Sequence, residues 1–336
     1  MGRYIAARIA LMVPVLLILV TVMFVILRIM PGDPVLAVLG GRNVSPEVIE
    51  EYRRRLGLDR PLTVQYVEYL GQIVRGDFGV SMRSGRPVLQ ELMERFPATL
   101  ELAVAGMGVA FVLGLAGGML AATRADRAAD HAMRLANVGL FAMPIFWFGL
   151  MLQMVFSVEL RWLPVGGRLD PVSQALFEPI TGFYVLDALL QRDWATLGLA
   201  LRHLVLPAIT LGVVLSGLVG RLSRTRLLEV LRADYIRTAR AKGVDERRVL
   251  WGHALRNAMI PIITVVGMQF ALLVAGAVLT ETVFTWPGVG RYLLTSIEYR
   301  DFPAIQGTVV FIALFISLVN LLVDLTYPII DPRVRF

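Results

Sequence analysis

The stretch "LAVAGMGVAFVLGLAGGMLAAT", residues 102–123, holds 22 consecutive residues without Asp, Glu, Lys or Arg. A helix rises about 1.5 Å per residue, so this segment is long enough to cross a hydrocarbon core about 30 Å thick. Five more uncharged runs, each 18 to 24 residues long, occur in the chain: 9–27, 135–158, 203–220, 257–280 and 302–323. The pattern predicts an all-α integral membrane protein with six transmembrane helices.

The composition of the 336-residue chain supports this class, since 57% of its residues are hydrophobic and only 18% are charged. Cys is absent, which excludes disulfides and thiolate metal sites. The run 9–27 is longer than the apolar core of a typical signal peptide, and no small-x-small cleavage pattern follows it, so we expect it to be retained. The run 203–220 is the shortest of the six and contains Pro207.

The distribution of basic residues predicts the orientation. With a cytoplasmic N-terminus, the inside segments hold 17 Arg and Lys in 68 residues and the outside segments hold 16 in 139. This excess follows the positive-inside rule, so both termini and the loop 221–256 are expected in the cytoplasm. The inside segments are 1–8, 124–134, 221–256 and 324–336, and the outside segments are 28–101, 159–202 and 281–301.

Three domains are expected: 1–27 is the cytoplasmic N-terminus with the first span, 28–101 is an extracytoplasmic helical insert, and 102–336 is the core of spans two to six. Within the insert, Ser45-Pro46-Glu47 predicts a helix that continues to Arg55 and is closed by Gly57. A second helix is expected near 64–73 and a third before Pro97. The insert is either a scaffold over the outer mouth or a docking surface for an extracytoplasmic partner. Residues 159–202 are expected to form an irregular loop with one short helix near 185–190.

Several catalytic classes are disfavoured. The only Lys, Lys242, follows Ala241, so no P-loop is present, and no Ser stands in a G-x-S-x-G elbow. The three His residues are far apart in sequence and no HExxH occurs, so we expect no metal site. The six runs contain no Asp, Glu, Lys or Arg that could relay protons, which disfavours a proton-coupled carrier. The basic residues lie between apolar runs rather than over a soluble domain, so nucleic acid is not an expected partner.

The densest positive charge lies in "ADYIRTARAKGVDERRVLWGHALRNAMIP", residues 233–261, which holds five Arg and the only Lys. Asp234 is expected to cap a short helix, Gly243 to occupy a left-handed position after it, and Asp245 to cap the next helix. A solvated charged face and an anchor to anionic lipids are two interpretations. The small residues Thr238, Ala239 and Ala241 favour a third, a helix that docks on another protein.

This stretch resembles the cytoplasmic EAA loop of ABC-importer permeases. Ala239, Gly243 and Leu255 match the general form of that loop, while "DYIRTARAKG" and "HALRNAMIP" are similar to its version in the dipeptide/oligopeptide/nickel branch. Other segments that resemble this branch, above all its dipeptide-type permease, are "RIMPGDP" (28–34), "LGLDRPLTVQY" (56–66), "GDFGVSM" (76–82), "RFPATLEL" (95–102), "MPIFWFG" (143–149), "ITGFYVLDALL" (180–190), "LRHLVLPAITLG" (201–212), "LTETVFTWPGVGRYL" (279–293) and "NLLVDLTYPIIDPRVR" (320–335).

The resemblance implies a type I ABC importer permease fold in the cytoplasmic (inner) membrane of a bacterium or archaeon. It implies a non-catalytic subunit that pairs with a homologous second permease, two ATPase subunits and an extracytoplasmic substrate-binding protein. ATP and Mg would then bind in the partner ATPases, and this chain would hold no cofactor. The residues expected to couple to an ATPase are Asp234, Tyr235, Arg237, Thr238, Ala239, Arg240, Lys242 and Gly243.

Two further groups are candidates for function. The outer segment after the fifth run is expected to re-enter near the pathway as a gate, or to pack an interfacial Trp; its residues are Glu281, Trp286, Pro287 and Gly288. Polar residues within the runs could line the pathway or bond neighbouring helices; they are Gln153, Ser157, Ser216 and Gln269.

The expected function is ATP-driven import of dipeptides or oligopeptides by alternating access. Nickel chelates, glutathione and oligosaccharides are alternative cargoes within the family. A secondary carrier or channel outside the ABC class and a membrane-embedded enzyme are the remaining alternatives.

Overall fold

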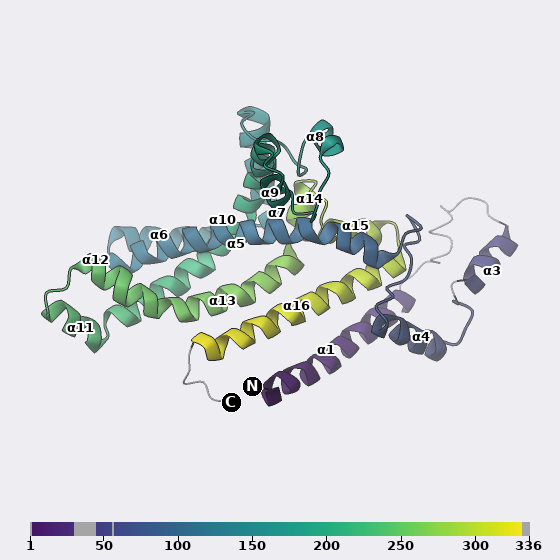
Figure 1. Ribbon diagram of the computed structural model, residues 1–336, viewed down its shortest axis with the longest axis horizontal. Helices are drawn as coiled ribbons and strands as arrows, with labels where there is room; N and C mark the ends of the chain where they lie inside the picture. Colours follow the sequence, from purple (N-terminus) through teal and green to yellow (C-terminus); the bar gives the residue numbers. More distant parts are fainter. Residues whose placement is uncertain (1, 30–44, 56, 331–336) are drawn as a thin grey trace.

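The computed structural model describes residues 2–29, 45–55 and 57–330, in which an isolated bridge between Val80 and Pro87 is the only β-pairing. Motif residues 30–34 and the end of the predicted cytoplasmic tail, 331–336, lie outside the described residues. Long helices run side by side along the long axis (Figure 1). They are α1 (Gly2–Ile29), α5 (Val88–Thr123), α6 (Ala128–Ala142), α10 (Trp194–Leu231), α13 (Leu255–Gly276) and α16 (Phe302–Ile330).

Four helical stretches are long and apolar enough to cross a membrane: Val88–Thr123, Trp194–Leu231, Glu246–Val274 and Phe302–Val323. The third of these joins α12 (Glu246–Arg248) and the π-helix η2 (Val249–Ala254) to α13. A bent helix pair would add a fifth span, and the described apolar part of α1, Ala10–Ile26, is shorter. The multi-pass, all-helical class predicted from sequence is confirmed, while the count of six spans stays a prediction.

The sequence predicted one straight span over the run 135–158. The structure shows a bent helix pair instead. After α6 the chain bends by 101° and continues as α7 (Ile145–Leu152) and the π-helix η1 (Gln153–Glu159). Pro144 disfavours helical backbone at the preceding residue, and Met143 is accordingly extended, with φ −85° and ψ 127°. An absence of charge indicates burial in lipid or protein, but it does not show whether a helix stays straight.

The predicted helices of the insert are present as α3 (Pro46–Arg55) and α4 (Leu62–Val74), and Gly57 has the expected positive φ of 64°. The helix predicted before Pro97 is present, but it is not a separate element. Instead α5 begins at Val88 and passes through Pro97 into the membrane, so the proposed domain boundary at residue 101 falls inside one helix. The last part of the insert, residues 88–101, is therefore continuous with the second predicted span.

Helices α5 and α10 form the most extensive interface of the molecule. Glycines allow their backbones to approach: a Cβ at Gly114 would lie 2.6 Å from Val219 Cβ, and a Cβ at Gly118 would lie 2.5 Å from Ser223 Cβ. Small residues at helix interfaces serve this purpose within membranes. A buried core that includes Leu102, Leu211 and Trp286 surrounds the N-terminal halves of these two helices.

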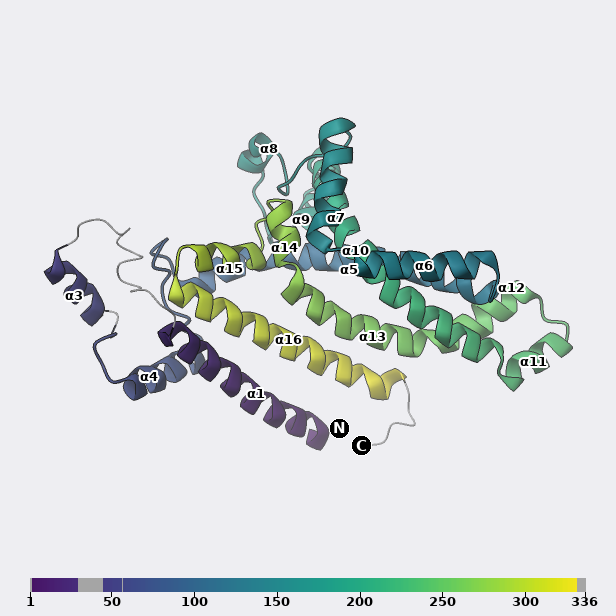
Figure 2. The same ribbon diagram turned by 180° about the vertical axis from the view of Figure 1, so that it is seen from behind.

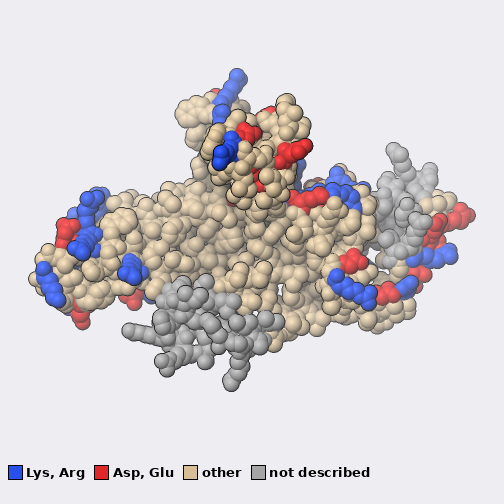
Figure 3. Space-filling view, viewed as in Figure 1, with Lys and Arg blue, Asp and Glu red and all other residues tan. Residues whose placement is uncertain are grey.

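The two ends of the long axis carry different short elements (Figures 1 and 2). Helices α11 (Asp234–Ala241) and α12 lie at one end, and α3, α4 and α15 (Val289–Glu298) lie toward the other. A projection from the middle contains α7, η1, α8 (Pro171–Leu176) and α9 (Tyr184–Leu190), and α9 confirms the short helix predicted near 185–190. Charged side chains gather at the ends and on the projection, which leaves an uncharged surface between them (Figure 3).

Candidate coupling site and outer segment

Helix α11 begins one residue earlier than the sequence predicted. Ala233 is the N-cap, with an extended backbone at φ −69° and ψ 149°, and no side chain caps the helix. Asp234 is therefore not the cap but the first helical residue, where its carboxylate lies 3.2 Å from the Arg237 guanidinium. A carboxylate in the first turn still favours the helix through its dipole.

The turn after α11 agrees with the prediction for Gly243. Its φ is +78°, the Gly243 N–H donates to the Arg240 carbonyl at 2.9 Å, and the Val244 N–H donates to the Ala239 carbonyl at 3.2 Å. These two bonds define a Schellman motif, in which glycine takes the left-handed position. Asp245 caps α12 as predicted, because its side chain accepts from the Arg247 N–H at 3.0 Å. The loop is thus a defined helix, turn and helix.

One face of α11 is anchored in the helical core of the protein. Ile236 is fully buried in a cluster with Leu227 of α10, Val249 of η2 and Ile262 of α13. The Asn257 side-chain amide donates to the Tyr235 hydroxyl at 2.7 Å. Burying an isoleucine side chain contributes about 1.5–3 kcal/mol, so α11 is held to three helical elements at once. The described contacts therefore link α11 to η2 and α13, and the same buried cluster includes Leu227 of α10.

The opposite face of α11 is exposed and basic. Arg237, Thr238, Arg240 and Lys242 all face outward. Arg240 also reaches across the turn to Glu246, with nitrogen–oxygen distances of 3.0 and 2.5 Å. The combination of a buried apolar anchor and a free charged face is what a docking helix requires, and Ala239 lies half-buried between the two faces.

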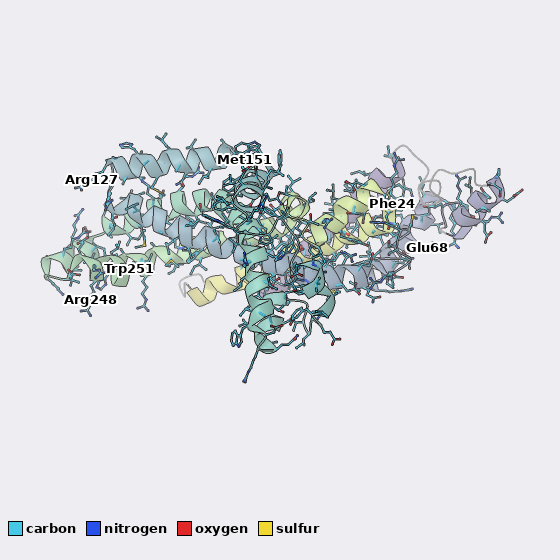
Figure 4. The ribbon with its side chains drawn as sticks, turned by 90° about the horizontal axis from the view of Figure 1, so that it is seen from above. Phe24, Glu68, Arg127, Met151, Arg248 and Trp251 are labelled. Atoms are coloured by element: carbon cyan, nitrogen blue, oxygen red, sulfur yellow. The ribbon has the colours of Figure 1, made fainter. Side chains whose placement is uncertain are left out.

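Figure 4 relates this region to the other predicted inside segments. The labelled Arg127, before α6, and Arg248, on α12, lie toward the same end of the molecule, and Glu68 of α4 lies toward the opposite end. The labelled Trp251 is 60% exposed near Arg248. Exposed Trp residues are enriched at membrane interfaces.

The predicted gate residues come together, and most of them are buried. Glu281 lies on α14 (Val278–Val283); its Oε1 accepts from the Thr99 hydroxyl at 2.7 Å and its Oε2 from the Arg291 N–H at 2.8 Å. Thr99 Oγ1 in turn accepts from the Val289 N–H at 2.8 Å. Gly288, the N-cap of α15, has no side chain, so Glu281 and Thr99 supply the capping oxygens. Burial raises the pKa of Glu281 to about 7.

Trp286 completes this connection to α5. It is 1% exposed and its Nε1 donates to the Ala98 carbonyl at 2.8 Å, whereas Pro287 is exposed. The geometry joins residues 278–298, hereafter the α14–α15 segment, to the N-terminal half of α5. Packing of the Trp is thus observed, and a gating role remains a prediction.

Sequence reasoning missed a buried ion pair beside Trp286. Arg168 and Glu101 lie 2.6 Å apart, and the Arg168 guanidinium stacks over Tyr184 with 3.6 Å to the ring centroid. Glu101 immediately precedes the run 102–123, and that position was the available signal. The pair holds the segment before α9 against α5.

The four predicted pathway residues have different neighbours and do not form one cluster. The Gln153 side chain donates to the carbonyls of Val165 and Val283 at 2.6 and 3.0 Å, and Ser157 donates to the Pro164 carbonyl at 3.0 Å. Ser216 bonds within its own helix, to Val213 O at 2.6 Å. Gln269 lies half-buried on α13. These bonds favour a structural role for the first three residues, and a pathway role stays a prediction.

A polar cavity of about 500 Å³ lies between α15 and the beginning of α5. The lining residues come from two predicted outside segments, 28–101 and 281–301. They include Arg83, Arg95 and Arg291, and also Glu91 and Asp301, which are buried. Within the described ranges 2–29, 45–55 and 57–330, no group of three or more His, Cys, Asp or Glu could hold a metal ion.

The structure so far described is a multi-pass helical core that carries an exposed basic helix, α11. Residues 114–336 match the family of the binding-protein-dependent transport system inner membrane component, and residues 1–103 match the N-terminal model of such membrane components. The chain belongs to this family, whose members are inner-membrane permease components of ABC transporters.

Curated relatives match over the full chain. It is 45% identical over 335 residues to the di/tripeptide transport system permease protein DppB of Pseudomonas aeruginosa (strain UCBPP-PA14), covering 100% of this chain and 99% of the relative. It is 44% identical over 340 residues to the dipeptide transport system permease protein DppB of Escherichia coli (strain K12), with the same coverage. The glutathione transport system permease protein GsiC of Escherichia coli O1:K1 / APEC is 38% identical over 336 residues and fully covered.

Proposed function

We propose that this chain is a pore-forming permease subunit of an ATP-driven importer for dipeptides and short oligopeptides. Full-length similarity to permeases named for dipeptide and di/tripeptide transport supports the cargo. The glutathione permease is also a relative, at 38% identity, and glutathione is itself a short peptide. Nickel chelates and oligosaccharides therefore become less favoured cargoes than peptides.

The proposed topology places α11 and both termini in the cytoplasm. It is supported by the twofold higher density of basic residues in the predicted inside segments and by Arg127 and Arg248 lying toward one end. In this orientation α4, α15 and the arginine-lined cavity face the outside. The insert and this cavity are then available to an extracytoplasmic binding protein.

The observation that carries the mechanism is the anchoring of α11 by Ile236. In the complex, α11 enters a groove of a partner ATPase, where Arg237, Arg240 and Lys242 orient it and Gly243 sets the turn. Closure of two ATPases on ATP and Mg moves α11, and the buried cluster passes this movement to α10 and α13. Alternating access then follows as a population shift, because the ATP-bound partners favour one arrangement of the helices.

A homologous second permease completes the pore in this proposal. The α14–α15 segment moves with the outer half of α5 as a gate, since Glu281 and Trp286 bond it to Thr99 and Ala98. Gln153, Ser157, Ser216 and Gln269 remain the proposed polar residues of the pathway.

The test is reconstitution of this chain with its second permease, its ATPases and its binding protein in liposomes. We expect uptake of radiolabelled Ala-Ala that requires internal ATP and the binding protein. Uptake that persists without ATP, or that requires a proton gradient, would contradict the ABC mechanism. Calorimetry on the binding protein with dipeptides, glutathione and nickel chelates then identifies the cargo.

A further inference from the structure

A groove lies between α5, α6 and α10 at the end of the molecule that carries α11. It has a volume of about 440 Å³, and its walls include Ala121, Met133 and Val138. An adjoining hollow of about 330 Å³ shares Gly117, Met133, Asn137 and Gly220 and extends to Leu113. Together they form one elongated apolar groove along three helices. In Figure 4, α6 runs from the labelled Arg127 toward the labelled Met151 of α7, beside α5 and α10.

One end of the groove is basic. Arg134, Arg221 and Arg224 line it. Arg224 is bound to the fully buried Asp130, with nitrogen–oxygen distances of 2.6 and 2.7 Å, and Arg134 shares that carboxylate at 3.1 Å.

The basic end of the groove has more arginine side chains than carboxylates. Arg134 also lies 3.7 Å from Asp126, whose side chain is 82% exposed. Arg221 is exposed, and within the described part of the chain no carboxylate lies within 4.0 Å of its guanidinium. Asp130 is fully buried and bound to two guanidiniums, so the open part of the groove presents unbalanced positive charge.

The basic end coincides with the edge of the apolar region. Arg221 directly follows the uncharged run 203–220, and Arg134 directly precedes the run 135–158. The rest of the groove extends along residues of the uncharged runs, such as Leu113 and Val138. An occupant must therefore be anionic at the membrane surface and apolar at membrane depth.

We propose that this groove binds one anionic phospholipid of the cytoplasmic leaflet. The phosphate lies between Arg221 and Arg134, and an acyl chain lies along Val138 and Leu113. Basic pockets between transmembrane helices on the cytoplasmic side are known sites for anionic headgroups. A free phosphate would leave the apolar wall uncovered, and an apolar helix of a partner subunit would leave Arg221 without a counter-charge.

The experiment uses the complete transporter, delipidated in detergent and titrated with dioleoyl phosphatidylglycerol or dioleoyl phosphatidylcholine, with binding scored by native mass spectrometry. We expect one phosphatidylglycerol and no retained phosphatidylcholine. Arg221→Gln should weaken phosphatidylglycerol binding about tenfold through loss of one charge-assisted contact, while Arg221→Lys should stay within about threefold because the charge remains.

Matched controls lie on the same helices. Arg226→Gln removes a charge on α10 that pairs with Glu229 and does not line the groove, so it should bind the lipid like the wild type. Val138→Trp fills the groove from a side chain that is 68% exposed and should abolish binding. Leu135→Trp, at a position 74% exposed on the same helix that does not line the groove, should not. Assembly of each complex, followed by size-exclusion chromatography, shows that the variants are folded.

Three outcomes would overturn the proposal. Equal lipid binding by the wild type, Arg221→Gln and Val138→Trp would show that the groove is not the site. Competition by glycerol 3-phosphate would show a site for a soluble anion. Binding to the isolated subunit that disappears in the complete transporter would show that the groove faces the second permease.

Discussion

Helix α11 and the α14–α15 segment hold their polar groups in opposite ways. On α11 the charged residues face outward and a single apolar side chain, Ile236, fixes the helix to the core. In the α14–α15 segment, Glu281 is buried and bonded to Thr99 and to the start of α15. The first arrangement leaves a surface free for a partner, and the second uses its charge to join elements of the same chain. Four experiments can break or sharpen this comparison.

The largest effect is expected from Ile236→Ala. Removing a fully buried isoleucine side chain to Ala typically costs 2–5 kcal/mol, about 3 kcal/mol here, and leaves α11 without its anchor. Hydrogen exchange of the α11 amides should become faster, and peptide uptake should fall while ATP hydrolysis continues. Thr238→Ala, on the exposed face of the same helix, is the control and should keep both properties. If Ile236→Ala transports normally, α11 does not act as a rigid lever.

Gly288→Ala should cost about 2 kcal/mol, because it forces a methyl group into an occupied site. A Cβ at Gly288 would lie 2.2 Å from Glu281 Oε1, whereas a Cβ at Gly198 of α10 meets no atom within 4 Å. The identical change Gly198→Ala should therefore be neutral or slightly stabilising. Thermal unfolding of the purified complex measures both. If the two variants unfold at the same temperature, the hydrogen bonds of the buried Glu281 carboxylate do not hold the α14–α15 segment rigidly.

Gly243→Val should cost about 1 kcal/mol or more, because a β-branched residue is strained at the φ of +78° observed there. No atom lies within 4 Å of a Cβ at this position, so conformation rather than crowding is tested. We expect weaker coupling of ATP hydrolysis to uptake. Gly243→Asn, which tolerates a left-handed backbone, should retain most of the coupling.

The smallest effect is expected at the Arg240–Glu246 pair, since exposed ion pairs contribute only about 0.2–1 kcal/mol. Glu246→Gln should leave the unfolding temperature nearly unchanged. Arg240→Gln should reduce the affinity of the ATPase subunit if Arg240 orients the dock, and a pull-down titration measures this. Equal losses for both variants would assign Arg240 to the turn rather than to the partner.

Local features of this molecule were predictable from sequence. Uncharged length indicated the four helical stretches that are long enough to cross a membrane. Gly243 and Asp245 indicated the turn, because glycine and capping residues act within a few positions of themselves. The Asp234 cap was wrong by one position, since Ala233 already has the extended backbone of a cap.

Long-range features were not predictable from local pattern. Thr99 and Glu281 are 182 positions apart, and no local periodicity relates them. The outer segment was recognised through its resemblance to a family motif, but the oxygens that cap α15 depend on how α5 packs against it. The bend at Pro144 and the continuation of α5 through Pro97 show that prolines in membrane helices need tertiary context to interpret.

The glycines between α5 and α10 limit which helices can change position during a transport cycle. A Cβ at Gly212 would lie 2.5 Å from Val109 Cβ, so the two backbones already meet with no free space. Sliding or rotating one helix against the other would bring such groups into collision, unless the pair first separated. The α5–α10 pair is therefore expected to move as one unit in this subunit, so that a movement delivered to α10 also displaces α5.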